Sequence, residues 1–282
     1  MKIRISSDST CDLNREYLEE HGVTLVTLYT NMGEDTYRDG IDITPADIFA
    51  HVAAGGELCS TTANNVADYD WVFTELLKEC DAVVHINIGA EFSCCHQNAK
   101  VAAAEFPGKV FVVDSRNLTT GQGLLVCEAV QMAESGEYSP QEIAERLNAL
   151  TDKVDASFLL GALDYIVKGG RCSPVAALGA NLLRLKPCIE LKDGKMVVGK
   201  KYRGSYEKCA VDYIKEKLSG REDIDYSRIF FVHTAISQEL IALVMAEIAR
   251  TAPFAEIIET TAGCTISCHC GPETLGLSFF KK

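Results

Sequence analysis

Hydroxyl-bearing residues follow several predicted strands of this chain, and they could hold an anionic group or take part in group transfer. Residues 83–88 are rich in β-branched side chains and predict a buried strand, and the pattern turns helical after Phe92. Ser93 stands where that helix should begin. Its hydroxyl could cap the helix by accepting from a first-turn amide, or it could donate to a ligand at the end of the strand. The sequence leaves both roles open.

Two further loops carry hydroxyl groups that could serve the same purpose. Residues 6–10, Ser-Ser-Asp-Ser-Thr, follow a first strand predicted over residues 2–6. Residues 59–65, Cys-Ser-Thr-Thr-Ala-Asn-Asn, are polar and predict turns before a helix that starts near residue 68. Three consecutive hydroxyls at a helix entry fit ordinary caps and turns, and they equally fit a cluster of donors for a ligand anion.

The residues that could bind a metal are poorly spaced for that purpose. Structural zinc sites usually pair two regular knuckles, whereas this chain has one irregular group, made of Cys264, Cys268, His269 and Cys270. Residues 94–96, Cys-Cys-His, would point in different directions on a helix. We therefore predict no metal and no cofactor. A redox or metal sensor built on the twelve cysteines stays as a third hypothesis.

Composition and charge exclude several classes of protein. The chain has 282 residues, 47% of them hydrophobic and 24% charged, so it can bury a sizeable core. Its net charge of −13 disfavours a nucleic-acid partner, which needs a basic patch, and it also disfavours general affinity for anionic membranes. The first residues hold no apolar signal region, and no run is long enough to span a membrane. We predict a cytoplasmic protein whose thiols are mostly reduced.

Strand and helix patterns alternate up to about residue 150, which predicts a parallel sheet with helices on its faces. Helix starts are marked by Thr44 before Pro45 and by a capping box that begins at Ser139. Strands are predicted at 2–6, 23–29, 83–88 and 109–113.

The pattern changes near Val154, where a strand at 157–160 leads toward a hairpin. Its strands are predicted at 186–191 and 195–202, on either side of Asp193-Gly194. We predict an α/β protein of two domains. Residues 1–153 would form an N-terminal, Rossmann-like parallel-sheet domain, and residues 154–282 a C-terminal α+β domain.

Common catalytic signatures are missing from the sequence. It contains no complete G-x-G-x-x-G, no G-x-x-x-x-G-K-[ST] and no G-x-S-x-G. One alternative is an enzyme for phosphoryl or acyl transfer that uses Asp8, Ser93 and His269 on a small substrate. Such an enzyme would show an open polar cleft, whereas a carrier would enclose an apolar tunnel.

The sequence resembles the DegV family of bacterial fatty-acid-binding proteins over nearly its whole length. The likeness rests on the order and spacing of short motifs, each of them weak by itself. These motifs are Ser7-Asp8-Ser9-Thr10-Cys11-Asp12-Leu13, Thr61-Thr62, Phe92-Ser93 with Gln97-Asn98-Ala99, Val113-Asp114-Ser115, Gly169-Gly170-Arg171-Cys172-Ser173, Lys186-Pro187, Asp193-Gly194-Lys195, Arg203-Gly204 and His269-x-Gly271-Pro272.

The resemblance implies a protein that encloses one long-chain fatty acid, such as palmitate, in a lipid tunnel between its two domains, without chemistry of its own. By motif, Thr61 and Ser93 would hold the carboxylate, and His269 would lie close to it. Arg171 and Arg203 match motifs of the second domain and would form a head-group or partner surface. Some members hand the acid to a fatty acid kinase, so such a kinase is an implied partner.

Three motifs depart from the family's usual sequence. Its Thr-Ser-Gln-Pro-Ser loop is Thr-Thr-Ala-Asn-Asn at 61–65, its Ser-Gly-Thr is Ser-Cys-Cys at 93–95, and Glu273 replaces a common glycine. The hydroxyls at positions 61 and 93 are kept. The resemblance therefore still implies carboxylate binding, but it does not give the preferred chain length.

Overall fold

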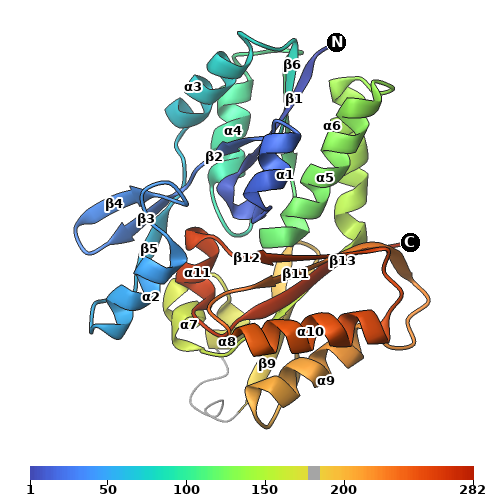
Figure 1. Cartoon of the computed structure of the whole chain (residues 1–282). Coiled ribbons are helices and arrows are strands. Elements are labelled where there is room, and N and C mark those ends of the chain that lie inside the picture. The colour runs from blue at the N-terminus through green and yellow to red at the C-terminus, as the bar shows by residue number, and fades with distance from the viewer. Residues whose placement is uncertain (177–184) are drawn as a thin grey trace.

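The first half of the chain folds around a four-stranded parallel sheet, in a computed structural model that describes residues 1–176 and 185–282 (Figure 1). The strand order is β2-β1-β6-β7, and every neighbouring pair is parallel, as predicted. These strands are β1 (Ile3–Asp8), β2 (Thr24–Val26), β6 (Ala82–Asn87) and β7 (Val110–Asp114).

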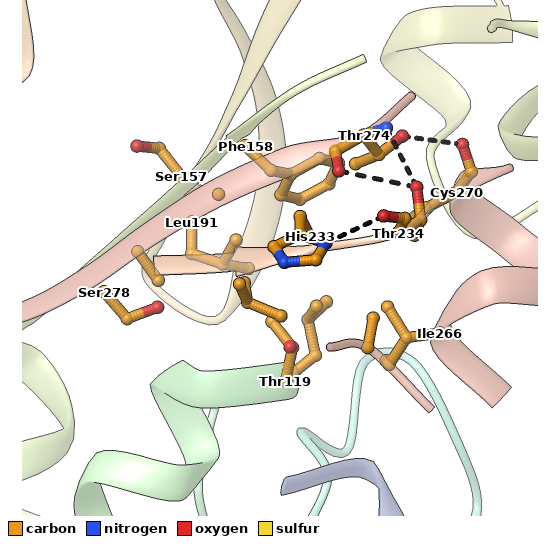
Figure 2. A pocket seen from close by; sticks show the side chains of 15 residues that line it. Thr119, Ser157, Phe158, Leu191, His233, Thr234, Ile266, Cys270, Thr274 and Ser278 are labelled. Carbon is orange, nitrogen blue, oxygen red and sulfur yellow. Dashed lines mark hydrogen bonds between the residues drawn. The ribbon is translucent and has the colours of Figure 1, made fainter. Parts of the chain in front are cut away.

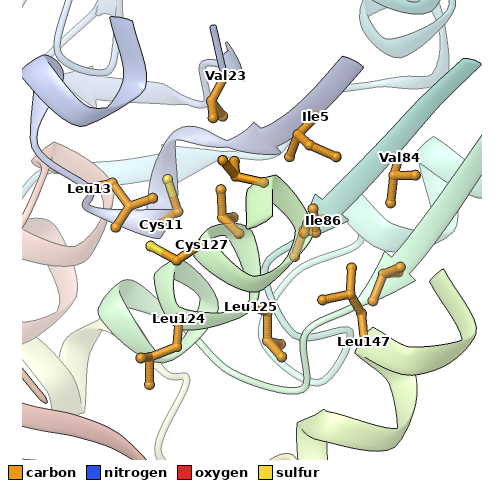
Figure 3. Packing of buried hydrophobic residues seen from close by; sticks show 14 of the residues in the cluster. Ile5, Cys11, Leu13, Val23, Val84, Ile86, Leu124, Leu125, Cys127 and Leu147 are labelled. Atoms are coloured by element: carbon orange, nitrogen blue, oxygen red, sulfur yellow. The ribbon is translucent and has the colours of Figure 1, made fainter. Parts of the chain in front are cut away.

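Helices cover both faces of this sheet because successive strand residues point to opposite sides. Val84 and Ile86 belong to a core formed with α1 (Arg15–Glu20), α5 (Thr119–Ser135) and α6 (Pro140–Leu150), which Figure 3 shows. Val83 packs on the other side, with α3 (Val66–Leu76) and α4 (Cys95–Ala103). Strand β6 is therefore buried along its whole length, as its β-branched run indicates.

The predicted helix starts are confirmed at two places and shifted at a third. Thr44 and Ser139 form capping boxes before α2 (Pro45–Ala53) and α6. Helix α3 begins at Val66 rather than near residue 68, because the side chain of Asn65 accepts from the amides of Ala67 and Asp68.

A small antiparallel sheet, ordered β4-β3-β5, corrects two predictions. The single strand expected at 23–29 is divided between β2 and β3 (Tyr29–Met32), which belong to different sheets. The turns expected at 59–65 contain β5 (Ser60–Thr62), which pairs with β3, and the third strand is β4 (Asp35–Arg38). A strand this short depends on a partner distant in sequence, which the local pattern does not reveal.

The second half forms a six-stranded mixed sheet, ordered β10-β9-β8-β13-β11-β12, in which only β11 and β12 pair in parallel. The predicted hairpin is confirmed, and Asp193 and Gly194 both have positive φ. The strands are β8 (Val154–Leu159), β9 (Lys186–Lys192), β10 (Lys195–Tyr202), β11 (Ile224–His233), β12 (Glu256–Thr261) and β13 (Leu275–Lys281). The domain boundary between 153 and 154 stays a prediction.

Helices α9 (Tyr206–Leu218) and α10 (Gln238–Thr251) pack together on one side of this sheet (Figure 1). Between the halves lies α11 (Cys264–Cys270), which contacts β3, β5 and α2 of the first half. The remaining elements are the short helices η1 (Ser9–Cys11), η2 (Thr151–Lys153), α7 (Asp164–Gly169) and α8 (Ser173–Ala176). None of the helices in the described part of the chain has the length and apolar character needed to cross a membrane.

Candidate functional site

A cavity of about 320 Å³ lies where β5, α4 and α11 meet. Four of the five predicted site residues line it: Thr61 on β5, Ser93 before α4, Arg171 after α7 and His269 on α11. The fifth, Arg203, is exposed just after β10 and is not part of this wall. The other lining residues are Leu28, Thr62, Ala63, Ile88, Phe92, Cys94, Leu118, Met196, Thr265, Ile266 and Cys270.

Ser93 lies one residue before the N-cap of its helix, and its hydroxyl still accepts from a first-turn amide. Helix α4 begins at Cys95, and its N-cap is Cys94. The Ser93 hydroxyl oxygen accepts from the Cys95 amide at 3.3 Å and donates to the Cys95 sulfur at 3.1 Å. Because a thiol sulfur is a weak acceptor, the hydroxyl proton of Ser93 can turn toward a better acceptor in the cavity.

His269 joins the two sides of the cavity through one hydrogen bond. Its Nε2 lies 2.8 Å from Oγ1 of Thr61. Its Nδ1 is buried without a partner among the described residues and lies against Gly169, where a Cβ would come within 2.4 Å. Burial, and to a lesser extent the charge of Arg171, lowers the pKa of His269 to about 4. The ring is therefore neutral at pH 7.

Helix α11 supplies four residues of the cavity wall, and two carboxyl groups hold its first turn. The Asp39 carboxylate accepts from the amides of Cys264 and Thr265 and from the Thr265 hydroxyl. The Asp12 carboxyl group accepts from the amide of Gly263. Sequence reasoning missed Asp39 and Thr265 entirely, and it placed Asp12 in a family motif without a role. Their function depends on contacts between segments more than 200 residues apart.

A narrower cavity of about 20 Å³ lies beside the first one, and Leu118, Ile266 and Cys270 line both. It lies between α11, the start of α5 and the six-stranded sheet (Figure 2). A volume near 20 Å³ holds about one water molecule, so its walls must separate to admit anything longer. The remaining lining residues are Thr119, Ala156, Ser157, Phe158, Leu191, Val232, His233, Thr234, Ala262, Thr274, Gly276 and Ser278.

The hydroxyl groups around this narrow cavity are bonded to the protein rather than free. Ser157 is paired with the Tyr213 hydroxyl at 2.8 Å, and Ser278 accepts from Thr120 at 3.0 Å. Thr274 donates to the carbonyl of Cys270 at 3.0 Å, a contact drawn in Figure 2. With these polar groups satisfied, the passage presents a mainly apolar surface to a ligand.

Asp8, the third member of the alternative catalytic set, lines neither cavity. Its buried carboxylate accepts from the Tyr69 hydroxyl at 2.7 Å, from Asn87 at 3.0 Å and from the amide of Ile88 at 2.9 Å. These bonds tie β1 to β6 and α3. The structure therefore brings Ser93 and His269 to one cavity but assigns Asp8 to the sheet.

The predicted metal-binding alternative does not assemble into a ligand cluster. Cys264 and Cys268 face an apolar group that contains Ile43 and Ile48, whereas Cys270 of the same helix lines the cavity. Within residues 1–176 and 185–282, no three His, Cys, Asp or Glu side chains come together as metal ligands would.

Two solved structures share this architecture over almost the entire chain. A fatty-acid-binding DegV family protein from Thermus thermophilus is 31% identical, with 100% of both chains covered and a TM-score of 0.90. A stearic-acid-binding protein from Eubacterium ventriosum is 29% identical, with 99% of this chain and 98% of that chain covered and a TM-score of 0.83.

Sequence comparison leads to the same group of proteins. A DegV domain-containing protein of Caldanaerobacter subterraneus is 29% identical over 286 residues, covering 100% of this chain and 99% of the relative. The model of the DegV family, described as uncharacterised proteins, matches residues 2–282. The chain belongs to the DegV family.

Proposed function

We propose that this protein binds one long-chain fatty acid, such as palmitate, with its carboxylate in the 320 Å³ cavity and its tail in the narrow passage. The observation that carries the proposal is that Thr61, Ser93 and His269, distant in sequence, line one cavity that shares part of its wall with a narrow, mainly apolar cavity. The fatty-acid-binding relative from Thermus thermophilus, with the same fold at 31% identity, supports it.

Thr61 and Ser93 are the proposed donors to the carboxylate. If His269 carries its proton on Nε2, that nitrogen donates to the Thr61 oxygen, and the Thr61 proton is free to donate to the ligand. The low pKa of His269 keeps this ring neutral, so it orients Thr61 rather than forming an ion pair. Helix α4 adds the partial positive charge of its N-terminus beside Ser93.

The tail supplies most of the proposed affinity. Each buried methylene group contributes about 0.8 kcal/mol, so about fourteen of them offer roughly 11 kcal/mol before the cost of association. The head group needs only enough donors to avoid an unsatisfied buried acceptor. Two hydroxyls and a rim arginine, Arg171, meet that need.

A carrier accounts for the site better than the alternative enzyme, and we infer that the protein has no catalytic activity. The alternative needs Asp8 beside the substrate, but that carboxylate accepts three hydrogen bonds inside the sheet. In a carrier, the exposed Arg203 could contact a partner, and Arg171 at the cavity could face both the ligand and that partner. Delivery to a fatty acid kinase stays a prediction, as does the cytoplasmic location.

Mass spectrometry of the lipid released when the purified protein is denatured tests the proposed function. We expect close to one fatty acid per chain and a higher melting temperature on adding palmitate to delipidated protein. Absence of extractable lipid together with no thermal shift would falsify the carrier proposal.

A further inference from the structure

Helix α11 has only seven residues, yet it supplies Thr265, Ile266, His269 and Cys270 to the cavity wall. A helix this short is not stable by itself, so its position depends on what holds it. Asp39 accepts from the Cys264 amide at 2.8 Å, the Thr265 amide at 3.2 Å and the Thr265 hydroxyl at 2.7 Å. The helix is thus held at its first turn by a side chain from the other half of the chain.

Asp39 is surrounded by hydrogen-bond donors. Besides its three bonds to α11, it accepts from the Ser9 hydroxyl at 3.1 Å. The side chain is buried, and all four of these partners are donors. Donors face both oxygens of this side chain, so replacing it with asparagine would place the new amide NH2 group against one of these donors.

Asp12 lies beside Asp39 in different surroundings. It accepts from the Gly263 amide at 2.9 Å and from the Thr119 hydroxyl at 2.6 Å. The titratable groups that face it are Asp39, Cys11 of η1 and Cys270 of α11, none of which is cationic. Burial, with a smaller contribution from Asp39, raises the pKa of Asp12 to about 8. Asp12 is therefore mostly protonated at neutral pH, and in that form its own proton is donated to the Thr119 oxygen, so the 2.6 Å contact is kept with its direction reversed.

Asp12 also connects α11 to the narrow cavity. Its partner Thr119 lines that cavity. Both residues have left-handed backbone conformations, with φ of 49° for Asp12 and 47° for Thr119. A β-branched residue adopts that conformation only where its surroundings hold it, and such positions gather at functional sites.

We propose that Asp39 and Asp12 are positioning residues that fix α11 and thereby set the geometry of the ligand cavity. Neither touches the ligand. When Asp12 loses its proton, two adjacent negative charges repel each other beneath α11, and the helix is held less firmly. Fatty acid affinity should therefore fall as the pH rises through the range in which Asp12 titrates. This inference rests on the proposed function for its affinity measurement.

The test compares Asp39→Asn, Asp12→Asn and, as a matched control, the exposed Asp35→Asn on β4. Palmitate dissociation constants are measured from pH 6 to 9, and amide hydrogen exchange is followed at residues 263–265. Asp39→Asn should weaken binding by about tenfold to a hundredfold and speed exchange at these amides, because it removes charged hydrogen bonds. Asp12→Asn mimics the protonated group, so its binding at pH 7 should stay close to that of the wild type.

The pH profile distinguishes positioning from a merely structural role. Wild-type affinity should fall between pH 7 and 9, and the Asp12→Asn profile should be flat. Cys11 and Cys270 do not compete as explanations, because burial raises the pKa of each thiol to about 12. A wild-type profile that is flat, or one that Asp12→Asn leaves unchanged, would overturn the role of Asp12.

The exchange measurement needs no ligand, so it separates this inference from the proposed function. Unchanged exchange at residues 263–265 in Asp39→Asn would show that Asp39 does not hold α11. Faster exchange with unchanged palmitate affinity would show that the hydrogen bonds between Asp39 and α11 do not determine the geometry of the ligand cavity. A wild type that binds no fatty acid would remove the proposed function, while exchange still decides what holds the helix. If Asp39→Asn does not fold, Ser9→Ala, which removes one donor to Asp39, should give a smaller change in the same direction.

Discussion

Replacing Thr61 with valine tests whether the hydroxyl of this residue donates a hydrogen bond to the ligand carboxylate. Valine keeps the branched shape and the strand propensity that suit β5, and it removes only the hydroxyl. Two groups then lose a partner: the carboxylate of the ligand and Nε2 of His269, which lies 2.8 Å from the Thr61 oxygen.

The expected loss can be estimated for each group. A buried acceptor left without its donor costs about 1–3 kcal/mol, which corresponds to about a fivefold to 150-fold loss of palmitate affinity. Thr61→Val should also lower the free energy of unfolding of the ligand-free protein by about 1–3 kcal/mol, because the His269 ring is then left with no partner at either nitrogen.

The assay is calorimetric titration of delipidated protein with palmitate and with its methyl ester, which keeps the tail but removes the charge. Ser60→Ala is the matched control, because Ser60 is an exposed hydroxyl residue of the same strand outside the cavity wall. Wild type and Ser60→Ala should prefer the acid strongly, and Thr61→Val should lose most of that preference. Ser93→Ala should behave similarly, and the double variant should not be additive, because both hydroxyls share one ligand group.

Two results would refute this reasoning. Equal binding of acid and ester by the wild type would show that the hydroxyls of Thr61 and Ser93 do not distinguish a carboxylate from an ester. An equal loss for acid and ester in Thr61→Val would show that the substitution acts on the shape of the cavity. In either case the assignment of Thr61 to the carboxylate has to be abandoned.

Three further predictions concern His269, the cysteines and the narrow passage. The pKa of His269 falls from 6.5 to about 4 on folding, so only the unfolded state takes up this proton as the pH drops from 6.5 to 4. The contribution of the neutral His269 ring to the free energy of unfolding is complete above pH 6.5 and is lost as the pH falls from 6.5 to 4. In acid denaturation curves, His269→Gln should therefore lose up to roughly 3 kcal/mol less stability over this range than the wild type. Cys59 packs against the apolar group that contains Cys268, and burial raises the pKa of both thiols, that of Cys268 to about 12. Because only the thiolate attacks a disulfide, oxidised glutathione at pH 7 should leave these two cysteines unlinked, and a loss of two hydrogens from the protein mass that Cys59→Ser prevents would contradict this. Ile266→Ala widens both cavities, so stopped-flow uptake of palmitate should be faster at a stability cost of about 2–5 kcal/mol, and unchanged uptake would show that Ile266 does not limit entry.

The elements that the sequence predicted correctly have local signals. The β-branched run of β6, the capping boxes at Thr44 and Ser139, and the turn at Asp193-Gly194 each act within a few residues. Such signals survive in most tertiary contexts, so they predicted the elements correctly. Strand β5 was missed because its three residues become a strand only by pairing with β3, about thirty residues earlier in the chain.

The sequence predicted only those residues of the candidate site that belong to a family motif. Thr61, Ser93 and His269 entered through family motifs, and the structure places all three on one cavity wall, while their role stays a prediction. Thr265 and Asp39 carried no such signal, because a buried carboxylate at a distant helix start looks like any surface aspartate in the sequence. Asp8 was placed in the alternative catalytic set because an aspartate at the end of a strand is a common catalytic position. Its carboxylate instead accepts hydrogen bonds that join β1 to β6 and α3.

We expect release of the ligand to depend on α11 more than on the head group. The proposed contacts of the carboxylate, two hydroxyls and Arg171, would contribute about 1.5–3 kcal/mol each, whereas about fourteen buried methylene groups would contribute roughly 11 kcal/mol. The passage proposed for the tail, however, has room for about one water molecule, and Ile266 and Cys270 of α11 form part of its wall. Opening that passage therefore requires movement of these side chains or of the helix. Asp39, from the opposite half of the chain, fixes the first turn of α11 by accepting from its amides. The strength of these hydrogen bonds should therefore govern how readily a fatty acid enters and leaves the passage.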